Sequence, residues 1–367
     1  MHPIELAAQS SSEPAIKRNE PIFKKVRWGV LSTANIGLKK VIPAMQNGQY
    51  SQVVAIASRD LAKAQAAAAG LGIPTAYGSY EELLADPNVD AIYNPLPNHL
   101  HVPWTIKAAE AGKHVLCEKP LGMFAAEAET LLAVRARTRV KIGEAFMVRC
   151  SPQWLRLRQL LDEGRIGELR SIAGFFSYFN VNPSNIRNQA EIGGGALMDI
   201  GCYLIQASRY AFTQEPTRVA ALIDRDPQLH TDRLTSAILE FPGGHAIFTC
   251  STQLIPYQRI YFLGTRGRIE MEIPVNMPND RPTRIFIDST GDLSGSGIAT
   301  ETFPACDQYT LQGDAFSKAA LEDTAVPVSV EDAIANMAVI DGLFTSGSSG
   351  GWVPLPIGKT LSAPPAK

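Results

Sequence analysis

The sequence predicts an α/β protein in which an N-terminal Rossmann fold precedes a C-terminal α+β domain built on a large, mostly antiparallel open sheet. Strand-like and helix-like segments alternate as far as residue 147, which is typical of a parallel sheet with helices on both faces. Longer strand-like segments dominate after residue 147. The length of 367 residues, 45% of them apolar and 19% charged, is enough for two domains with well-filled cores.

Each element of the first half follows from a local signal. Runs of apolar and β-branched residues predict strands at residues 26–31, 52–57, 90–93, 114–117 and 141–146. Helices are predicted at residues 35–46, 60–69, 104–111 and 125–137. The first three have a glycine stop signal, at Gly48, Gly70 and Gly112. Ser79 and Glu82 form a capping box that opens one more short helix.

The second half changes rhythm. An amphipathic helix is predicted at residues 153–161, ended by Gly164, and another helix at residues 330–344. Strands are predicted at residues 171–178, 218–223, 236–241, 245–251, 260–263, 267–272 and 283–287. Pro242-Gly243-Gly244 indicates a hairpin loop between two of them. Loops are expected at residues 289–297 and 346–351. We expect helices on one face of this sheet and an open second face.

Composition excludes several classes of protein. A net charge of −2 provides no electrostatic footprint for nucleic acid or an anionic membrane. No apolar run approaches the roughly 18 residues that span a bilayer, and no signal peptide is recognisable. The five cysteines are scattered without a metal-type pair, which indicates reduced thiols, no metal site and a cytoplasmic location. The predicted division is a flexible arm (1–26), a nucleotide-binding domain (27–147), a second domain (148–357) and a tail (358–367).

The first strand runs into a turn that resembles a dinucleotide-binding loop. The segment is Ser32-Thr33-Ala34-Asn35-Ile36-Gly37, which keeps only the last glycine of the G-x-G-x-x-G pattern. Small residues still allow backbone N–H groups and the helix N-terminus to hold a pyrophosphate. We therefore expect residues 32–36 to bind the cofactor, with a plain strand–turn–helix as the alternative.

The end of the second strand indicates which dinucleotide is bound. NAD enzymes usually carry an acidic residue there for the ribose diol, whereas NADP enzymes admit an arginine for the 2′-phosphate. This chain has Ser58-Arg59-Asp60, with Lys63 one turn further on. Ser58, Arg59 and Lys63 therefore favour NADP over NAD, unless Arg59 is merely a solvated surface residue and Asp60 a helix cap.

Two segments are candidates for the reaction centre. Lys119 ends the fifth strand and is followed by Pro120, so its side chain is expected in the cleft at the carboxyl edge of the sheet, although most surface lysines are solvated and idle. In the second domain three glycines precede Ala196-Leu197-Met198-Asp199-Ile200-Gly201-Cys202-Tyr203. If this segment is helical, Asp199 and Tyr203 share one face, and the glycines allow close approach to a cofactor or substrate. A core helix with a buried tyrosine is the alternative.

Taken together, these motifs resemble the glucose-fructose oxidoreductase, inositol dehydrogenase and MocA family (Gfo/Idh/MocA). The resemblance covers residues 25–356 and rests on the turn, Pro97-Asn98-x-x-His101, Glu118-Lys119-Pro120 and the glycine-rich segment ending in Tyr203. Many members have histidine in place of Tyr203. Tyrosine there, with Asn185-Ile186-Arg187 upstream, is similar to the branch of D-xylose dehydrogenases, dimeric dihydrodiol dehydrogenases and glucose-fructose oxidoreductase.

The resemblance implies roles for individual residues. Lys119 and Tyr203 would contact the reacting hydroxyl or carbonyl group, and Asp199 would aid orientation. Those expected near the cofactor are Pro97, Asn98, His101, Glu118, Lys119 and Arg187. Arg149 is expected to contact substrate with Asp199 and Tyr203, although Val148, Cys150 and Ser151 depart from the aromatic and histidine neighbours that related sequences often carry. A homodimer or homotetramer through the second-domain sheet is also implied.

We therefore expect an NADP-dependent oxidoreductase that transfers hydride between nicotinamide and the carbinol or carbonyl carbon of a sugar, polyol or related cyclic alcohol. Tyr203 would exchange the proton, and a nearby Lys119 ammonium would lower the phenol pKa toward the working pH. Two alternatives stay open: an enzyme that holds NADP tightly and shuttles hydride between two sugars, and a nucleotide-binding sensor without turnover.

Overall fold

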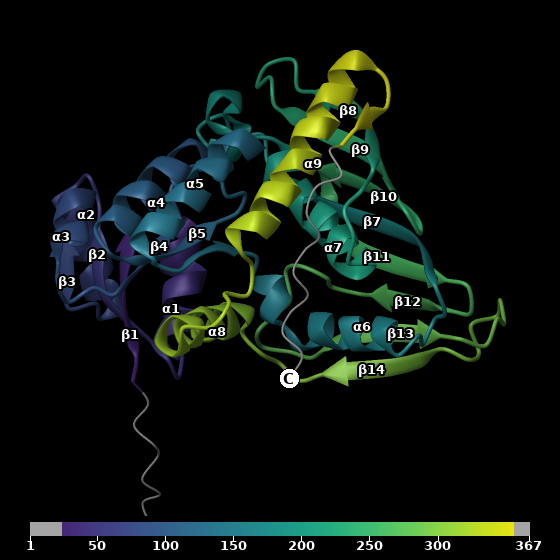
Figure 1. Cartoon of the computed structure of the whole chain (residues 1–367), viewed down its shortest axis with the longest axis horizontal. Helices are drawn as coiled ribbons and strands as arrows, with labels where there is room; N and C mark the ends of the chain where they lie inside the picture. The colour runs from purple at the N-terminus through teal and green to yellow at the C-terminus, as the bar shows by residue number, and fades with distance from the viewer. Residues whose placement is uncertain (1–23, 356–367) are drawn as a thin grey trace, which may run out of the picture.

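The computed structural model describes residues 24–355, which form two α/β units side by side (Figure 1). The predicted tail and all but residues 24–26 of the predicted N-terminal arm lie outside the described residues. The predicted fold class is confirmed, because the first unit is a parallel sheet between helices and the second is a large sheet with helices on one face.

The first sheet has six parallel strands in the order β3-β2-β1-β4-β5-β6. Because the strand order reverses between β1 and β4, a crevice forms at the carboxyl ends of these two strands. The strands are β1 (Val26–Leu31), β2 (Ser51–Ala57), β3 (Thr75–Tyr77), β4 (Ala91–Asn94), β5 (His114–Glu118) and β6 (Ile142–Ala145).

Helices cover both faces of this sheet. The π-helical turn η1 (Gly37–Val41), α1 (Ile42–Gln46) and α2 (Leu61–Leu71) share a core cluster with one face. On the other face lie α3 (Tyr80–Ala85), α4 (His101–Glu110) and α5 (Ala125–Thr138). The serine half of the predicted capping box is confirmed, since the Ser79 side chain accepts a hydrogen bond from the Glu82 N–H, whereas Glu82 Oε2 accepts from the Gly78 N–H rather than from Ser79.

The second sheet has nine strands in the order β14-β13-β12-β11-β7-β10-β9-β8-β15. All neighbours are antiparallel except β7 and β10, which run parallel. The hairpin predicted around Gly243 is confirmed, because Phe241 and Gly244 pair across it. The strands are β7 (Leu169–Phe179), β8 (Arg218–Arg225), β9 (Asp232–Phe241), β10 (Gly244–Ser251), β11 (Gln253–Gly264), β12 (Arg268–Met271), β13 (Thr283–Asp288), β14 (Ala299–Phe303) and β15 (Val353–Pro354).

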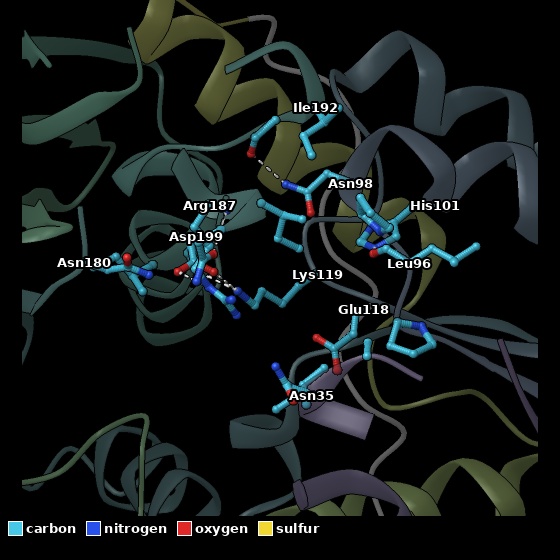
Figure 2. A pocket seen from close by; sticks show the side chains of 18 of the residues that line it. Asn35, Leu96, Asn98, His101, Glu118, Lys119, Asn180, Arg187, Ile192 and Asp199 are labelled. Carbon is cyan, nitrogen blue, oxygen red and sulfur yellow. Dashed lines mark hydrogen bonds and ion pairs between the residues drawn. The ribbon is translucent and has the colours of Figure 1, made fainter. Parts of the chain in front are cut away.

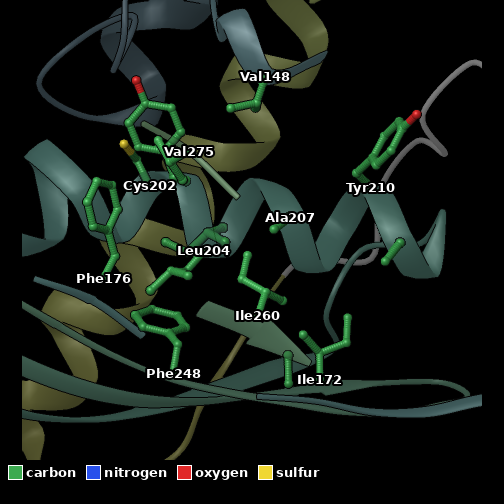
Figure 3. Packing of buried hydrophobic residues seen from close by; sticks show 14 of the residues in the cluster. Val148, Ile172, Phe176, Cys202, Leu204, Ala207, Tyr210, Phe248, Ile260 and Val275 are labelled. Carbon is green, nitrogen blue, oxygen red and sulfur yellow. The ribbon is translucent and has the colours of Figure 1, made fainter. Parts of the chain in front are cut away.

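One face of the second sheet is covered by α6 (Pro152–Asp162), α7 (Cys202–Phe212) and α9 (Val330–Ser349). Figure 3 shows α7 crossing this face, with Leu204 and Ala207 against strand residues such as Ile260. All eleven residues of α7 are buried. A Cβ on Gly174 of β7 would lie 2.8 Å from the Leu204 side chain, so a glycine lets the helix approach the sheet closely.

No helix within residues 24–355 covers the opposite face of the second sheet. Strand alternation exposes Phe175, Ile238 and Ile247 there, each 42–48% exposed, whereas their neighbours along the strand are buried. With Trp352 and other small and apolar residues they line a shallow hollow of about 470 Å³. The predicted open face is therefore present and apolar.

Helix α8 (Gln308–Glu322) was not expected, and it returns from the second half of the chain to the first sheet. Its Phe316 ring lies 5.4 Å from the Trp28 ring, and Ser317 Oγ accepts a hydrogen bond from Trp28 Nε1 at 3.0 Å. Its Asp314 accepts hydrogen bonds from the backbone N–H groups of residues 49 and 50. Although α8 lies in the range assigned to the second domain, it brings Tyr309 to the boundary between the two units.

Two predicted helix ends were wrong. Helix α2 continues through Gly70 and ends at Leu71, because the left-handed residue that terminates it is Gly72 (φ 64°), whose N–H bonds the Ala68 carbonyl. Helix α9 continues through Ser346 to Ser349, so most of the loop predicted at residues 346–351 is helical. The buried Ser346 hydroxyl donates to Gly351 O and accepts from the Ala221 N–H, so a residue type common in loops here joins a helix to β8.

Candidate active site

A cavity lies where the crevice of the first sheet meets the second unit (Figure 2). Its volume is about 820 Å³. It collects side chains that are far apart in the sequence. Its predicted lining residues are Ser32, Thr33, Ala34, Asn35, Ile36, Pro97, Asn98, His101, Glu118, Lys119, Arg187, Asp199 and Tyr203. Phe176, Tyr178, Asn180, Met147 and Tyr309 also line it, and sequence reasoning missed them.

The turn after β1 forms one wall of this cavity. Ser32 has φ 77°, the left-handed conformation that favours glycine, at a cost of roughly 1 kcal/mol for another residue. Its hydroxyl accepts a hydrogen bond from the Ala34 N–H at 3.3 Å, which offsets part of that cost. The following helix starts at Asn35, and the first N–H groups of a helix have no partner within it. The start of this helix therefore presents backbone N–H donors of the kind that bind anions, without the first two glycines of the G-x-G-x-x-G pattern.

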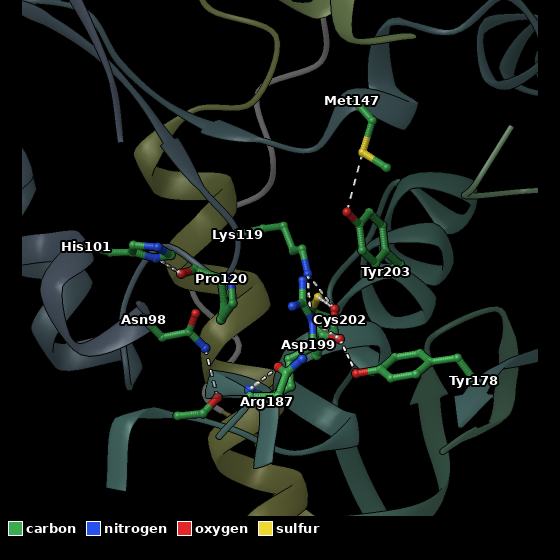
Figure 4. A network of polar contacts seen from close by, with 12 residues as sticks. Asn98, His101, Lys119, Pro120, Met147, Tyr178, Arg187, Asp199, Cys202 and Tyr203 are labelled. Atoms are coloured by element: carbon green, nitrogen blue, oxygen red, sulfur yellow. Dashed lines mark hydrogen bonds and ion pairs between the residues drawn. The ribbon is translucent and has the colours of Figure 1, made fainter. Parts of the chain in front are cut away.

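Lys119 joins the two units across the cavity. Its Nζ donates to the Asp199 carbonyl oxygen at 2.5 Å and to Asp199 Oδ1 at 3.2 Å (Figure 4). Burial is the largest single effect and lowers the pKa of Lys119, but the Asp199 carboxylate, together with smaller contributions from Cys202 and Glu118, raises it above its usual value. Lys119 is therefore an ammonium group near neutral pH.

Asp199 is held by three donors. Oδ1 accepts from Lys119, and Oδ2 accepts from Tyr178 Oη at 2.6 Å and from Arg187 Nε at 2.9 Å. Burial would raise the pKa of Asp199, but the Lys119 ammonium and the Arg187 guanidinium hold it well below its usual range. Asp199 is therefore ionised and fixed, and it balances charge between the two cations.

Tyr203 lies beside Lys119, but its hydroxyl does not point at the ammonium. The Lys119 Nζ is 5.0 Å from the centre of the Tyr203 ring, while the hydroxyl donates to Met147 Sδ at 3.4 Å. Burial, followed by the nearby Glu118, raises the pKa of Tyr203 well above its usual value. The expected lowering of this pKa by Lys119 was therefore wrong. Tyr203 is a neutral phenol, able to donate a proton.

Glu118 and His101 support the loops around Lys119. Glu118 Oε1 accepts from the Tyr93 hydroxyl at 2.7 Å, and burial raises the pKa of this carboxyl group. The His101 ring nitrogens lie 2.7 Å from Pro120 O and 2.6 Å from Leu96 O. Burial lowers the pKa of His101 to about 4, so the ring is neutral and donates to one of these carbonyls. His101 thus spans the loops that follow β4 and β5.

The three glycines of the second unit approach protein rather than open space. An added Cβ on Gly193 would lie 2.8 Å from Met123 Sδ and 3.0 Å from Asn98 atoms, and Asn98 Nδ2 donates to Gly193 O at 2.8 Å. A Cβ on Gly195, whose φ is 119°, would lie 1.9 Å from Asp232 Oδ1. The close packing predicted for these glycines is present, but it joins the two units and seats the start of the π-helical turn η6 (Leu197–Gly201).

Four predicted residues lie outside the cavity lining. Ser58, Arg59 and Lys63 follow β2, which pairs with β1, so they border the turn of residues 32–36. Ser58 Oγ accepts from the Asp60 N–H, and Lys63 lies 3.6 Å from the Asp60 carboxylate. Arg149 turns away from the cavity: its Nη1 donates to Asp332 Oδ2 at 2.9 Å, and its guanidinium lies 4.5 Å from the Tyr210 ring centre.

The missed residues had weak signals in the sequence. Tyr178 ends a predicted strand, so its place at a sheet edge was available, but nothing indicated Asp199 as its partner. Tyr309 begins the unexpected helix α8. Within residues 24–355 no group of three or more His, Cys, Asp or Glu side chains is arranged to hold a metal ion. Over the same range no helix is long and apolar enough to cross a membrane.

Comparison with known proteins gives matches over both units. Residues 26–146 match the model of an oxidoreductase family with an NAD-binding Rossmann fold, and residues 154–270 match the GFO/IDH/MocA C-terminal domain. An uncharacterized oxidoreductase of Rhizobium meliloti is 46% identical, over 89% of this chain and 98% of that protein. A D-xylose 1-dehydrogenase (NADP(+)) of Haloferax volcanii is 37% identical, over 89% and 99%.

A solved structure shares the architecture. A 3-ketoreductase from Actinomadura kijaniata, in complex with NADP and TDP-benzene, superposes with a TM-score of 0.81 and 31% identity. The match covers 88% of this chain and 98% of that one.

Proposed function

The chain belongs to the Gfo/Idh/MocA family of oxidoreductases, and we propose that it is an NADP-dependent enzyme that interconverts a carbinol and a carbonyl group on a sugar, polyol or related cyclic alcohol. One observation carries the proposal. An ammonium group from the first unit, Lys119, and a phenol from the second, Tyr203, line the same cavity as the nucleotide turn. The NADP named for the xylose dehydrogenase and the ketoreductase agrees with this assignment.

We propose which residues would hold NADP from their places around the cavity and beside it. The turn of residues 32–36 provides backbone donors for the pyrophosphate, and Ser58, Arg59 and Lys63 lie beside it at the end of β2, where a 2′-phosphate would be bound. The rest of the cavity wall that would face NADP includes Pro97, Asn98, His101, Glu118 and Arg187. When bound, the nicotinamide gives or takes the hydride.

The chain supplies the proton and the charge. In carbonyl reduction, neutral Tyr203 donates its proton to the substrate oxygen and becomes a phenolate, which takes a proton from solvent; in alcohol oxidation the same phenolate form takes the carbinol proton. Lys119 stabilises negative charge on that oxygen, while Asp199 keeps the ammonium in place. Because the Lys119 charge lies against the ring face rather than the phenol oxygen, it acts on the substrate more than on Tyr203.

The test is a screen for NADP and NAD reduction or oxidation at 340 nm with aldoses, inositols, ketosugars and trans-dihydrodiols. With the substrate found, Tyr203→Phe should lower turnover by about 10² to 10⁴-fold, the usual contribution of general acid–base catalysis. Binding of NADPH should be nearly unchanged, because Tyr203 is not part of the nucleotide turn. Wild-type turnover in Tyr203→Phe, with chemistry shown to limit the rate, would contradict the assignment.

The same screen separates the alternatives. NADP that copurifies with the protein and survives dialysis, with hydride exchange between two sugars, would favour the shuttle. Dinucleotide binding without turnover on any substrate would favour the sensor. Lys119 pairs with Asp199, and its ammonium lies over the Tyr203 ring. The presence of all three side chains in one group supports turnover.

We also propose that two copies associate through the open face of the second sheet. Exposed apolar side chains gather there over neighbouring strands, at Phe175 on β7, Ile247 on β10 and Ile238 on β9, and a self-associating sheet face would remove them from water. The five cysteines are unpaired thiols, which supports a reducing compartment such as the cytoplasm.

A further inference from the structure

We propose that the 3₁₀ turn η3 (Met147–Cys150) is the positioning element of the proton donor. In this assignment Met147 directs the Tyr203 hydroxyl within the cavity, and Arg149 anchors the turn to the helix that carries Tyr203. The inference rests on the proposed role of Tyr203, and its test is designed to separate the two.

The ring of Tyr203 is fixed on several sides. The Phe146 ring meets it edge-on at 5.1 Å, the Phe176 ring lies at 6.1 Å, and the Lys119 ammonium lies over its face. The hydroxyl proton can still rotate about the C–O bond. Its acceptor is Met147 Sδ, which lies 3.4 Å from Tyr203 Oη. Because Met147 is 3% exposed and lines the cavity, it sets the direction of that proton at the edge of the reaction space.

A thioether suits this task because it is a weak acceptor. The sulfur holds the hydroxyl in one orientation, but a substrate oxygen that enters the cavity is a stronger acceptor and takes the hydrogen bond over. A carboxylate or amide oxygen in the same place would compete with the substrate for the proton. The residue type at position 147 thus matches a donor that must release its proton.

Arg149 fixes the turn from its other side. Its guanidinium pairs with Asp332 at 2.9 Å and stacks over the Tyr210 ring. Tyr210 follows Tyr203 by seven residues on α7, about two helical turns. Asp332 also pairs with Arg209 of α7 at 2.8 Å.

η3 therefore contacts α7 at two points, Met147 against Tyr203 and Arg149 against Tyr210. Together the two contacts fix the position of the Met147 sulfur relative to the Tyr203 hydroxyl. This accounts for an arginine beside the site that does not reach the cavity. Arg149 and Met147 are positioning residues, acting through Tyr203.

The experiment is a double-mutant cycle. Met147→Leu conserves volume and removes the acceptor. It should lower kcat by about 2- to 10-fold, the range of one ordinary hydrogen bond, and leave KM for NADP unchanged. In a Tyr203→Phe background the same substitution should have no effect, because no hydroxyl remains to orient. Met337→Leu, a fully buried core methionine of α9, is the matched control and should keep wild-type kcat in both backgrounds.

Arg149→Met should lower kcat in the same Tyr203-dependent way, and Arg149→Lys, which can still pair with Asp332, should recover part of the loss. Since loss of Arg149 leaves a buried carboxylate with fewer partners, thermal midpoints are measured for both variants, and the Met147→Leu cycle decides the question if Arg149→Met does not fold. Tyr203→Phe with full turnover would defeat the proposed function itself. The positioning role alone would be overturned if Tyr203→Phe lowers kcat but Met147→Leu keeps wild-type kcat. It would also be overturned if Met147→Leu lowers kcat by the same factor in the wild-type and Tyr203→Phe backgrounds.

Discussion

Replacing Asp199 by asparagine tests the electrostatics on which the cavity depends. In the wild type both carboxylate oxygens accept hydrogen bonds, Oδ1 from Lys119 and Oδ2 from Tyr178 and Arg187. An asparagine has one oxygen, and its NH2 group is itself a donor. Whichever way the amide is turned, it faces at least one of the three donors with hydrogens, and two cations lose their counter-charge.

The magnitude follows from burial. Removing one partner of a buried ion pair costs about 3–5 kcal/mol. The Asp199 side chain is 13% exposed, and Lys119 keeps its hydrogen bond to the Asp199 carbonyl oxygen. We therefore expect the lower end, a loss of about 3 kcal/mol in the free energy of unfolding at pH 7.

The stability lost in Asp199→Asn should depend on pH and should become smaller at low pH. The pKa of Asp199 is depressed in the folded state, so its stabilisation is present above the unfolded-state value of about 3.9 and is lost as the pH falls toward the folded value. The stability difference between wild type and Asp199→Asn should be constant from pH 8 to about pH 5 and should shrink below about pH 4.

The measurement is urea and thermal unfolding of both proteins across this pH range. Asp162→Asn is the control: Asp162 is 65% exposed and pairs with Arg158 on the surface of α6, so its loss should change stability by less than about 0.5 kcal/mol. Equal stability of Asp199→Asn and wild type at pH 7, or a difference that persists undiminished at pH 3, would refute the charge assignment.

Four further predictions follow from the described contacts. Arg59→Asp should lower the NADP-to-NAD ratio of kcat/KM by about 10- to 100-fold, because it removes the charged hydrogen bond that we propose Arg59 makes to the 2′-phosphate; steady-state kinetics with both cofactors measure this ratio. Asn98→Ala should raise KM for the substrate by about 2- to 10-fold without a comparable loss of kcat, because it removes the bond to Gly193 O that joins the two units. Ile247→Lys should shift the mass in analytical ultracentrifugation to the monomer, whereas Leu61→Lys, on exposed α2, should not. The kcat of carbonyl reduction should stay flat from pH 6 to 9, because the raised pKa of Tyr203 keeps the donor protonated; a pH–rate profile that falls near neutral pH would contradict this.

Alternation in the sequence predicts most of the fold because burial acts locally. The predicted bounds of β1, residues 26–31, are the observed bounds, since an apolar run between polar segments is buried as a unit. Helix α8 could not be predicted this way. Its Gln308, Gln312 and Ser317 are buried polar residues, and the partners of Gln308 and Ser317 come from distant parts of the chain, so its pattern does not resemble a helix with one apolar face.

The sequence likewise identifies some residues of the candidate site, whereas others are placed only by the fold. Motifs identify Lys119, Asp199 and the nucleotide turn because spacing and position at a strand end are visible in the sequence. Arg149 follows the cavity residue Met147 by two positions, and only the fold shows that a 3₁₀ turn directs Met147 into the cavity and Arg149 away from it. Adjacent residues in such a turn point in different directions, so closeness in sequence carries no information about which of them reaches a substrate.

The sign of the Tyr203 pKa shift shows why residue types alone cannot define a mechanism. A lysine next to a tyrosine suggests a stabilised phenolate, but Coulomb energy depends on the distance from the charge to the ionising oxygen. Here the ammonium lies over the ring, the oxygen is directed to a neutral sulfur, and Asp199 already balances the Lys119 charge. Burial therefore dominates and keeps the phenol neutral. In the proposed mechanism the ammonium, which has one N–H beyond its two bonds to Asp199, would act on the substrate oxygen, so proton transfer and charge stabilisation would belong to different side chains.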